Sequence, residues 1–172
     1  HRVAVVAATY CEAWDVCIKG ESGILSCVPD SVVATATRST GEVIFTNGAR
    51  VDAYSAEKPD GLRGPQHHRA WCDELAKWRY IEAWDQLMFG LRLGVNPQCV
   101  ITTTPKPLGL LGDLLGRPTT MTTRGSTFAN ARNLAPAALA ELEARYGTSR
   151  LGRQELYAEL LADYEGALWQ RH

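Results

Sequence analysis

Two groups of oxygen-bearing side chains, Asp73-Glu74 and Thr102-Thr103-Thr104, each stand at the predicted end of a strand. Ligands of α/β proteins bind outside the carboxyl ends of parallel strands, so we expect both groups to face one crevice. Adjacent carboxylates in such a crevice suit nucleotide hydrolysis. One of them holds the Mg²⁺ that bridges the phosphates, and the other orients or deprotonates the attacking water.

Arg63 and the threonine triplet are the other candidates for chemistry. Arg63 stands eleven positions before Glu74, in a polar loop with Pro59, Gly61 and Gly64. An exposed loop arginine is by default only solvated. Beside a phosphoryl group, however, a guanidinium can neutralise developing charge. Threonine in a strand is usually a β-former, but three hydroxyls next to an acidic pair are placed to sense phosphate or water.

The elements that must position these groups appear first as apolar patterns near the start of the chain. Residues 3–8 are a run of valine and alanine, which predicts a strand buried on both faces of a parallel sheet. Thr9 is placed to cap a helix over residues 11–18. Asn47-Gly48 predicts a hairpin turn at the sheet edge, because both residue types tolerate positive φ.

The second half of the chain predicts further elements. Residues 82–93 repeat apolar side chains at helical spacing up to Gly94, and residues 99–101 predict the next buried strand. Residues 119–123 are rich in threonine and predict another strand. Two helices are expected near the end, one beginning at Pro136 and one capped by Ser149.

The composition bounds the class of protein. The 172 residues suit one domain, and the hydrophobic fraction of 45% and charged fraction of 22% are those of an ordinary globular protein. A net charge of −1 means that any DNA contact must come from a local patch. No apolar run approaches the roughly 20 residues of a membrane helix, so no membrane role is expected. The five cysteines show no Cys-x-x-Cys spacing and are expected to be reduced thiols.

A phosphate-binding loop is absent from the sequence. That loop requires Gly-x-x-x-x-Gly-Lys followed by serine or threonine, and the four lysines precede Gly20, Pro59, Trp78 and Pro107. The first residues already predict a strand.

Three alternatives stay open at this point. His67 and His68 with Asp73 could hold a transition metal, although neighbouring strand residues point to opposite faces. Cys72 with His67 or His68 could form a hydrolase pair, although no oxyanion-type glycine turn accompanies it. A non-catalytic interaction module of a packaging complex, a remnant that keeps the fold and a partner surface, is the third.

Several segments together resemble the ATPase domain of phage-type terminase large subunits, and specifically its C-terminal portion. Terminases are motors that package double-stranded DNA into viral or gene-transfer-agent capsids. The segments, in this order and spacing, are Leu62–His67, Trp71–Leu75, Trp84–Gly94, Thr102–Pro107, Thr123–Thr127, Gly152–Glu155 and Glu165–Trp169.

The resemblance implies a fold and a domain plan. The expected fold is a three-layer α/β P-loop NTPase core of the additional-strand class, with a largely parallel sheet and a small helical lid. The P-loop strand would be missing from this chain. Residues 1–124 would form the ATPase core, and residues 125–172 the lid and the start of a linker to an absent nuclease domain.

The resemblance also implies roles. Asp73 would hold Mg²⁺, Glu74 would polarise the attacking water, and Arg63 would reach the ATP of a neighbouring subunit as an arginine finger. Thr102, Thr103 and Thr104 would couple the nucleotide state to movement. The expected partners are double-stranded DNA, a portal protein, a small terminase subunit and further copies in a homo-oligomeric ring, in the host cell cytoplasm.

Overall fold

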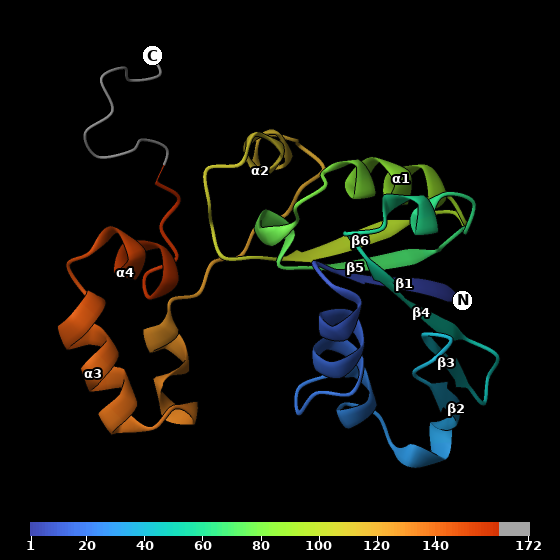
Figure 1. Cartoon of the computed structure of the whole chain (residues 1–172), viewed down its shortest axis with the longest axis horizontal. Coiled ribbons are helices and arrows are strands. Elements are labelled where there is room, and N and C mark those ends of the chain that lie inside the picture. Colours follow the sequence, from blue (N-terminus) through green and yellow to red (C-terminus); the bar gives the residue numbers. More distant parts are fainter. Residues whose placement is uncertain (162–172) are drawn as a thin grey trace. The chain divides into compact units, whose positions relative to one another are not determined.

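One mixed sheet forms the centre of the computed structural model, which describes residues 1–161 (Figure 1). Its strand order is β2-β3-β4-β1-β5-β6. The strands are β1 Arg2–Ala7, β2 Val33–Thr37, β3 Glu42–Phe45, β4 Arg50–Ser55, β5 Arg69–Asp73 and β6 Gln98–Thr102. The strands β4, β1, β5 and β6 run parallel, and β2 and β3 add an antiparallel edge. The predicted α/β class with a largely parallel sheet is confirmed.

The strand β1 lies in the middle of this sheet because its side chains are small and apolar. Residues 4–7 are at most 1% exposed, as the run of valine and alanine predicts for a strand covered on both faces. On one face, Val5 and Ala7 pack against the helix η1 (Glu12–Ile18), which has π-helical hydrogen bonding. Trp14 and Ile18 of η1 complete this part of the core.

Helix α1 (Glu82–Gly90) covers the opposite face, so the sheet lies between two helical layers (Figure 1). Its residues Ala83, Trp84 and Leu87 are buried. Short 3₁₀ segments occupy the connections of this part of the chain: η2 Ile24–Ser26, η3 Asp30–Val32, η4 Pro59–Leu62 and η5 Leu75–Lys77. The segment η4 packs against α1 in the crossover from β4 to β5.

Three local expectations are wrong. The helix predicted over residues 82–93 ends at Gly90, because the Gly90 carbonyl accepts a hydrogen bond from the His67 amide and Leu91 forms a bridge with His67. The strand at residues 99–101 is an edge strand rather than a buried one, and Val100 is 63% exposed. Residues 119–123 form no strand.

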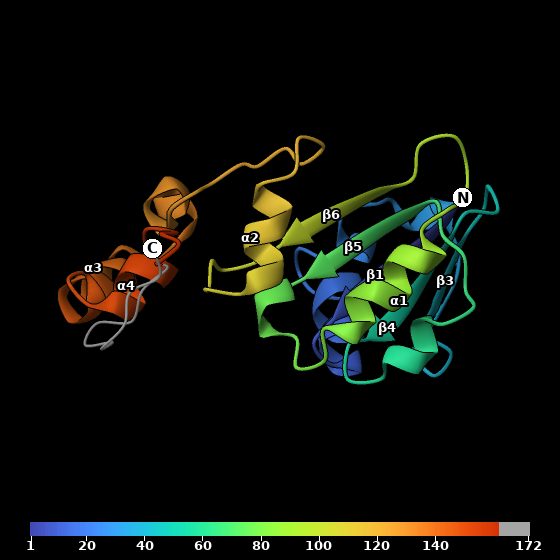
Figure 2. The ribbon, with the colours of Figure 1, turned by 90° about the horizontal axis from the view of Figure 1, so that it is seen from above.

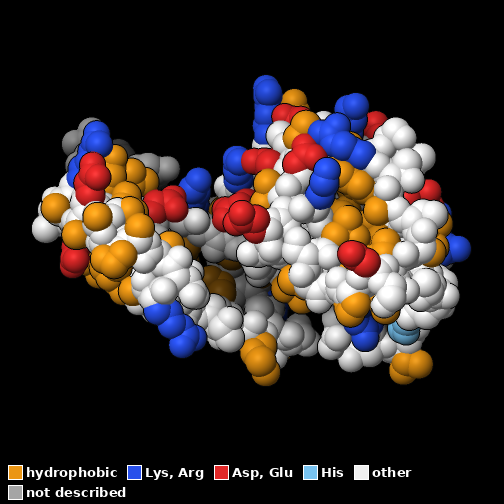
Figure 3. Space-filling model, turned by 90° about the horizontal axis from the view of Figure 1, so that it is seen from below, with side chains coloured by type: hydrophobic (Ala, Val, Ile, Leu, Met, Phe, Trp, Pro, Cys, Tyr) orange, Lys and Arg blue, Asp and Glu red, His pale blue; other side chains and the backbone are white. Residues whose placement is uncertain are grey.

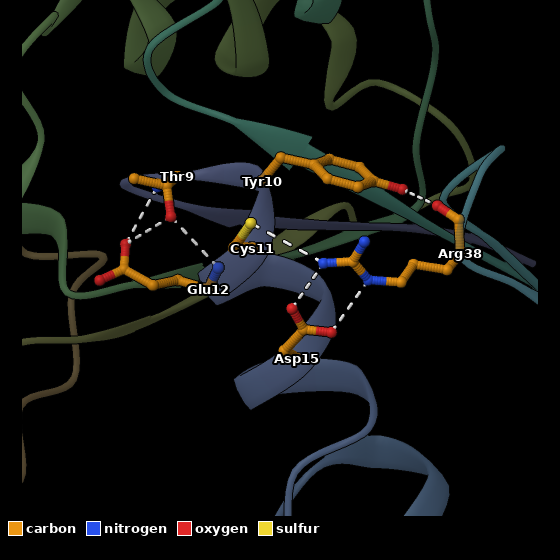
Figure 4. A network of polar contacts seen from close by, with 6 residues as sticks. All are labelled: Thr9, Tyr10, Cys11, Glu12, Asp15 and Arg38. Atoms are coloured by element: carbon orange, nitrogen blue, oxygen red, sulfur yellow. Dashed lines mark hydrogen bonds and ion pairs between the residues drawn. The ribbon is translucent and has the colours of Figure 1, made fainter.

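The turn between β2 and β3 is tied to η1 by polar contacts (Figure 4). The Arg38 guanidinium donates to both carboxylate oxygens of Asp15, at 3.0 and 2.7 Å, and the Tyr10 hydroxyl donates to the Arg38 carbonyl. Since about half of each charged side chain is exposed, solvent screens this pair and it adds little to stability. The next hairpin, between β3 and β4, is closed by Asn47-Gly48, where Gly48 has φ +79°.

The chain divides into two compact units, His1–Thr103 and Thr104–His172. The second unit contains α2 Gly109–Leu115, η6 Thr127–Asn133, α3 Pro136–Tyr146 and α4 Arg150–Glu155. Pro136 begins α3, and the Ser149 hydroxyl accepts from the Gly152 amide at the start of α4, as predicted. The predicted boundary between core and lid at residue 124 stays a prediction. The segment Glu165–Trp169 and the end of the predicted linker lie outside the described residues.

Among residues 1–161, no helix is both long and apolar enough to cross a membrane.

The packing of η1 leads to a first prediction. Ile18 is fully buried, whereas Val16 of the same helix is 58% exposed. Replacing Ile18 with alanine should lower the free energy of unfolding by about 2–5 kcal/mol, because it removes buried methyl groups and leaves a cavity. The matched control Val16→Ala should change it by less than about 0.5 kcal/mol. Urea unfolding measures both, and equal losses would show that η1 does not pack as described.

Candidate active site

The acidic pair lies where the carboxyl ends of the parallel strands meet. The strand β5 pairs with β1 on one side and with β6 on the other, and the register places Asp73 directly opposite Thr102. Figure 2 shows the arrowheads of β5 and β6 side by side at this edge. The predicted crevice residues Asp73 and Thr102 are therefore brought together.

A short chain of hydrogen bonds fixes the Asp73 carboxylate. The Thr102 hydroxyl donates to Oδ1 of Asp73 at 2.6 Å and accepts from the Trp71 indole nitrogen at 3.0 Å. These three side chains are on the face of the sheet that η1 covers, because Trp71 packs against the η1 cluster and residues 71 and 73 alternate with 72. Thr102 therefore does more than favour a strand, because its hydroxyl orients the Asp73 carboxylate.

Glu74 follows in a tight turn with left-handed backbone geometry. Its φ is +49° and its ψ is +49°, a conformation that costs a non-glycine residue roughly 1–2 kcal/mol. The turn is held on both sides: the Trp78 indole donates to the Asp73 carbonyl at 2.9 Å, and the Ala76 amide donates to the Thr103 hydroxyl at 3.1 Å. Strained backbone of this kind collects at functional sites.

Glu12 and Lys77, which the sequence analysis did not propose as site residues, link this turn to η1. The Glu12 carboxylate accepts from the Thr9 amide and hydroxyl at 3.0 and 3.1 Å, and the Thr9 hydroxyl accepts from the Glu12 amide (Figure 4). This is a capping box, which the spacing Thr-x-x-Glu could have revealed. Glu12 also forms an ion pair with Lys77, three residues after Glu74. No local pattern predicts that pair.

Lys77 is the cation nearest in sequence to the acidic pair. Its hydrogen bond with Glu12 raises the pKa of Lys77, and the charges of Glu12, Glu74 and Asp73 act in the same direction. The same hydrogen bond lowers the pKa of Glu12. The ion pair thus joins the turn after β5 to the beginning of η1 after β1.

Cys17 of η1 lies under the Asp73 carboxylate. Burial raises the pKa of Cys17 to about 12, and the charge of Asp73 and a hydrogen bond with it add to this effect. The thiol therefore stays protonated. It is a weak donor beneath the carboxylate rather than a nucleophile.

The donor set around Asp73 fits a hard cation. The groups at this edge are a carboxylate and hydroxyl oxygens, which Mg²⁺ prefers, and Mg²⁺ usually keeps several waters rather than taking many protein ligands. Within the described part of the chain, no three histidine, cysteine, aspartate or glutamate side chains are placed to hold a metal together. A single carboxylate is nevertheless enough for a water-bridged Mg²⁺ beside phosphates.

The other predicted residues lie elsewhere. Arg63 is at the end of η4, on the face that α1 covers, and lines a pocket with residues of α1. Thr104 begins the second compact unit, where its hydroxyl donates to Glu155 at 3.3 Å. Of the threonine triplet, Thr102 contacts the acidic pair directly and Thr103 contacts the turn that follows it.

The histidines and Cys72 do not form the alternative sites. His67 is 1% exposed and packs edge-on against Tyr54, and the His68 ring accepts from the Arg2 amide. Both precede β5, whereas Asp73 ends it. The Cys72 thiol is buried 3.5 Å from the Cys99 sulfur, and that contact together with burial raises the pKa of Cys72. A protonated, buried thiol at the far end of a strand from both histidines is not an activated nucleophile.

Comparison with known families gives a match over the whole chain. Residues 1–172 match the family model described as "Terminase large subunit, T4likevirus-type, N-terminal". Because this model describes the N-terminal part of the subunit, the expected placement in a C-terminal portion of the ATPase domain is corrected. No curated protein matches the sequence.

Solved structures with this fold are also terminases. The large terminase ATPase domain of a Thermus phage is 18% identical, with a TM-score of 0.63 over 93% of this chain and 76% of that one. The large terminase of a thermophilic bacteriophage is 10% identical, with a TM-score of 0.73 over 93% of this chain and 41% of that one. A second structure of that terminase, in complex with ADP, is 11% identical with a TM-score of 0.70, over 93% of this chain and 40% of that one. At these identities the likeness shows the fold alone, and it confirms the predicted P-loop NTPase class.

The bond between Thr102 and Asp73 can be tested with an isosteric change. Thr102→Val keeps the shape and favours a strand, but it removes the donor to Asp73 and the acceptor for Trp71. We expect the free energy of unfolding to fall by about 0.5–1.5 kcal/mol, the net value of a typical hydrogen bond. Thr102→Ser, which keeps the hydroxyl, should lose less. Urea unfolding would contradict this role if valine equalled or exceeded the wild type.

Proposed function

The chain belongs to the terminase large subunit family, and on this premise we propose that its protein hydrolyses ATP to drive double-stranded DNA into a viral or gene-transfer-agent capsid. The observation that carries the proposal is the acidic pair at the carboxyl end of β5, with Thr102 hydrogen-bonded to Asp73. The ADP complex of a structurally similar terminase supports nucleotide binding.

Each residue of the site would have a different role in hydrolysis. Bound Mg²⁺ would supply charge neutralisation at the phosphates. Asp73 would hold it through water, in the orientation that Thr102 fixes. Glu74 would accept a proton from the attacking water, and its strained turn would keep the carboxylate beside the phosphates. Thr103, bonded to the Ala76 amide in the turn after Glu74, would transmit a change in that turn to the chain leading to the second unit.

The assembly is proposed on family membership. Further copies in a homo-oligomeric ring, a portal protein and a small terminase subunit would be its partners, in the host cell cytoplasm. On the face shown in Figure 3, lysine and arginine side chains lie among acidic ones and form no broad basic patch. With a net charge of −1, contact with double-stranded DNA would come from local groups of cations.

Glu74→Gln in the full-length large subunit tests the hydrolytic role. The amide cannot accept the proton of water, so turnover should fall by at least about 10²-fold while ATP binding remains. Glu21→Gln, an equivalent change at an exposed position, is the matched control and should leave turnover unchanged. Near-normal turnover of the Glu74 variant would show that another residue is the base, whereas no turnover by the wild-type large subunit would favour a non-catalytic module of the packaging complex.

Arg63 is proposed to act in trans on the ATP of a neighbouring subunit. Arg63→Ala should then leave nucleotide affinity of the monomer intact but lower ring turnover by roughly 10³-fold. Rings mixed from Arg63→Ala and Glu74→Gln subunits should regain some activity, because each variant lacks a different half of the shared site. Absence of recovery, together with weaker ATP binding by the Arg63 variant, would place Arg63 in its own subunit's site.

A further inference from the structure

A pocket opens where the end of α1 meets the loop after η4. Its volume is about 360 Å³, and two of its seven lining residues are arginines while none is acidic. The lining residues are Arg63, Gly64, Pro65, Gln86, Phe89, Gly90 and Arg92.

Neither guanidinium group of the pocket has a polar partner among residues 1–161. Other arginines of the chain are paired, such as Arg38 with Asp15 and Arg50 with Asp52 and Glu42. Arg63 and Arg92, in contrast, form no ion pair and no side-chain hydrogen bond with any of the described residues. Two unneutralised cations on one concave surface favour an anionic ligand, and the planar guanidinium matches phosphate oxygens with two parallel hydrogen bonds.

The backbone around the pocket is preformed. A Cβ at Gly90 would lie 2.6 Å from the Pro65 carbonyl oxygen, so glycine is required for this close approach of α1 to the loop. The His67 amide donates to the Gly90 carbonyl at 2.9 Å, and this hydrogen bond also fixes the end of α1 against the loop. Gly64 has φ +106° with open space around it. Phe89, 73% exposed, adds an apolar surface to the pocket wall.

The pocket is too far from Asp73 to contact a nucleotide bound at the acidic pair of the same chain. Gly90 is hydrogen-bonded to His67, which precedes β5, whereas Asp73 is the last residue of β5. At about 3.3 Å per residue, the six steps from His67 to Asp73 span roughly 20 Å. A phosphate in the pocket therefore belongs to another molecule.

We propose that this pocket receives the phosphates of a nucleotide bound to a second copy of the protein, with Arg92 acting there beside Arg63. This rests on the proposed function and adds a second guanidinium to it. A compact, concave pocket suits a short triphosphate chain, whereas the phosphates of a DNA duplex are spread along a wide, rigid surface. Two guanidinium groups can share the charge that develops on a transferred phosphoryl group.

Binding to the 172-residue chain is the first test, with inorganic tripolyphosphate as the probe. Calorimetry should show binding that Arg92→Ala and Arg63→Ala each weaken by about tenfold or more, the scale of a lost charge-assisted hydrogen bond. Arg79→Ala is the matched control, since Arg79 lies over the Tyr80 ring and outside the pocket. Equal weakening by Arg79→Ala, or no binding at all, would overturn the phosphate site.

Turnover of assembled full-length subunits is the second test. Arg92→Ala should lower ring ATPase activity by at least about 10²-fold with monomer ATP affinity unchanged, and Arg92→Lys should recover little, because an ammonium lacks the planar fork. Mixing Arg92→Ala with Glu74→Gln subunits should restore activity.

The outcomes separate the two proposals. If Arg63→Ala abolishes turnover and Arg92→Ala does not, the role of Arg92 is wrong and the proposed function stands. If assembled wild-type subunits hydrolyse no ATP, the proposed function fails whatever the pocket binds. If Arg92→Ala instead weakens binding of a double-stranded DNA fragment at normal turnover, the pocket binds DNA and the nucleotide assignment is overturned.

Discussion

The parallel pairing of β5 with β1 on one side and β6 on the other is the constraint on which the candidate site depends. It places three strand ends at one edge, so that residues far apart in sequence meet there without a dedicated loop. Asp73 and Thr102 lie opposite each other because of this register, and a slip of one residue would turn each to the other face. The small side chains of β1 make the arrangement possible, since both of its faces are covered.

Local signals in the sequence predicted much of the fold. The valine and alanine run of β1 and the Asn47-Gly48 turn depend on neighbouring residues, and both have the expected structure. Long-range contacts explain why the predictions for the end of α1 and for the burial of β6 were wrong. The end of α1 at Gly90 is set by His67, more than twenty positions earlier, and the exposure of β6 follows from its place at the edge. In the site, the acidic pair and Thr102 could be predicted, whereas the pair of Glu12 with Lys77 joins residues 65 positions apart.

The acidic pair and the arginine-lined pocket lie at opposite ends of β5. The acidic pair follows β5, whereas Arg63 and Arg92, which form no ion pair among the described residues, line a pocket near the start of β5. The strain at Glu74 and the close approach at Gly90 show that both ends are fixed by backbone geometry rather than by flexible side chains alone. Under the proposed assembly, an interface between two copies would bring these two different ends together.

The strand β6 has a hydrogen-bonded neighbour on one side only among the described residues. Its outer edge carries Cys99-Val100-Ile101, without the lysine or proline that often protects an exposed edge strand. Such an edge is a template for pairing with another strand, and a net charge near zero gives little repulsion between molecules. At high concentration the purified chain is therefore expected to be open to edge-to-edge aggregation along β6.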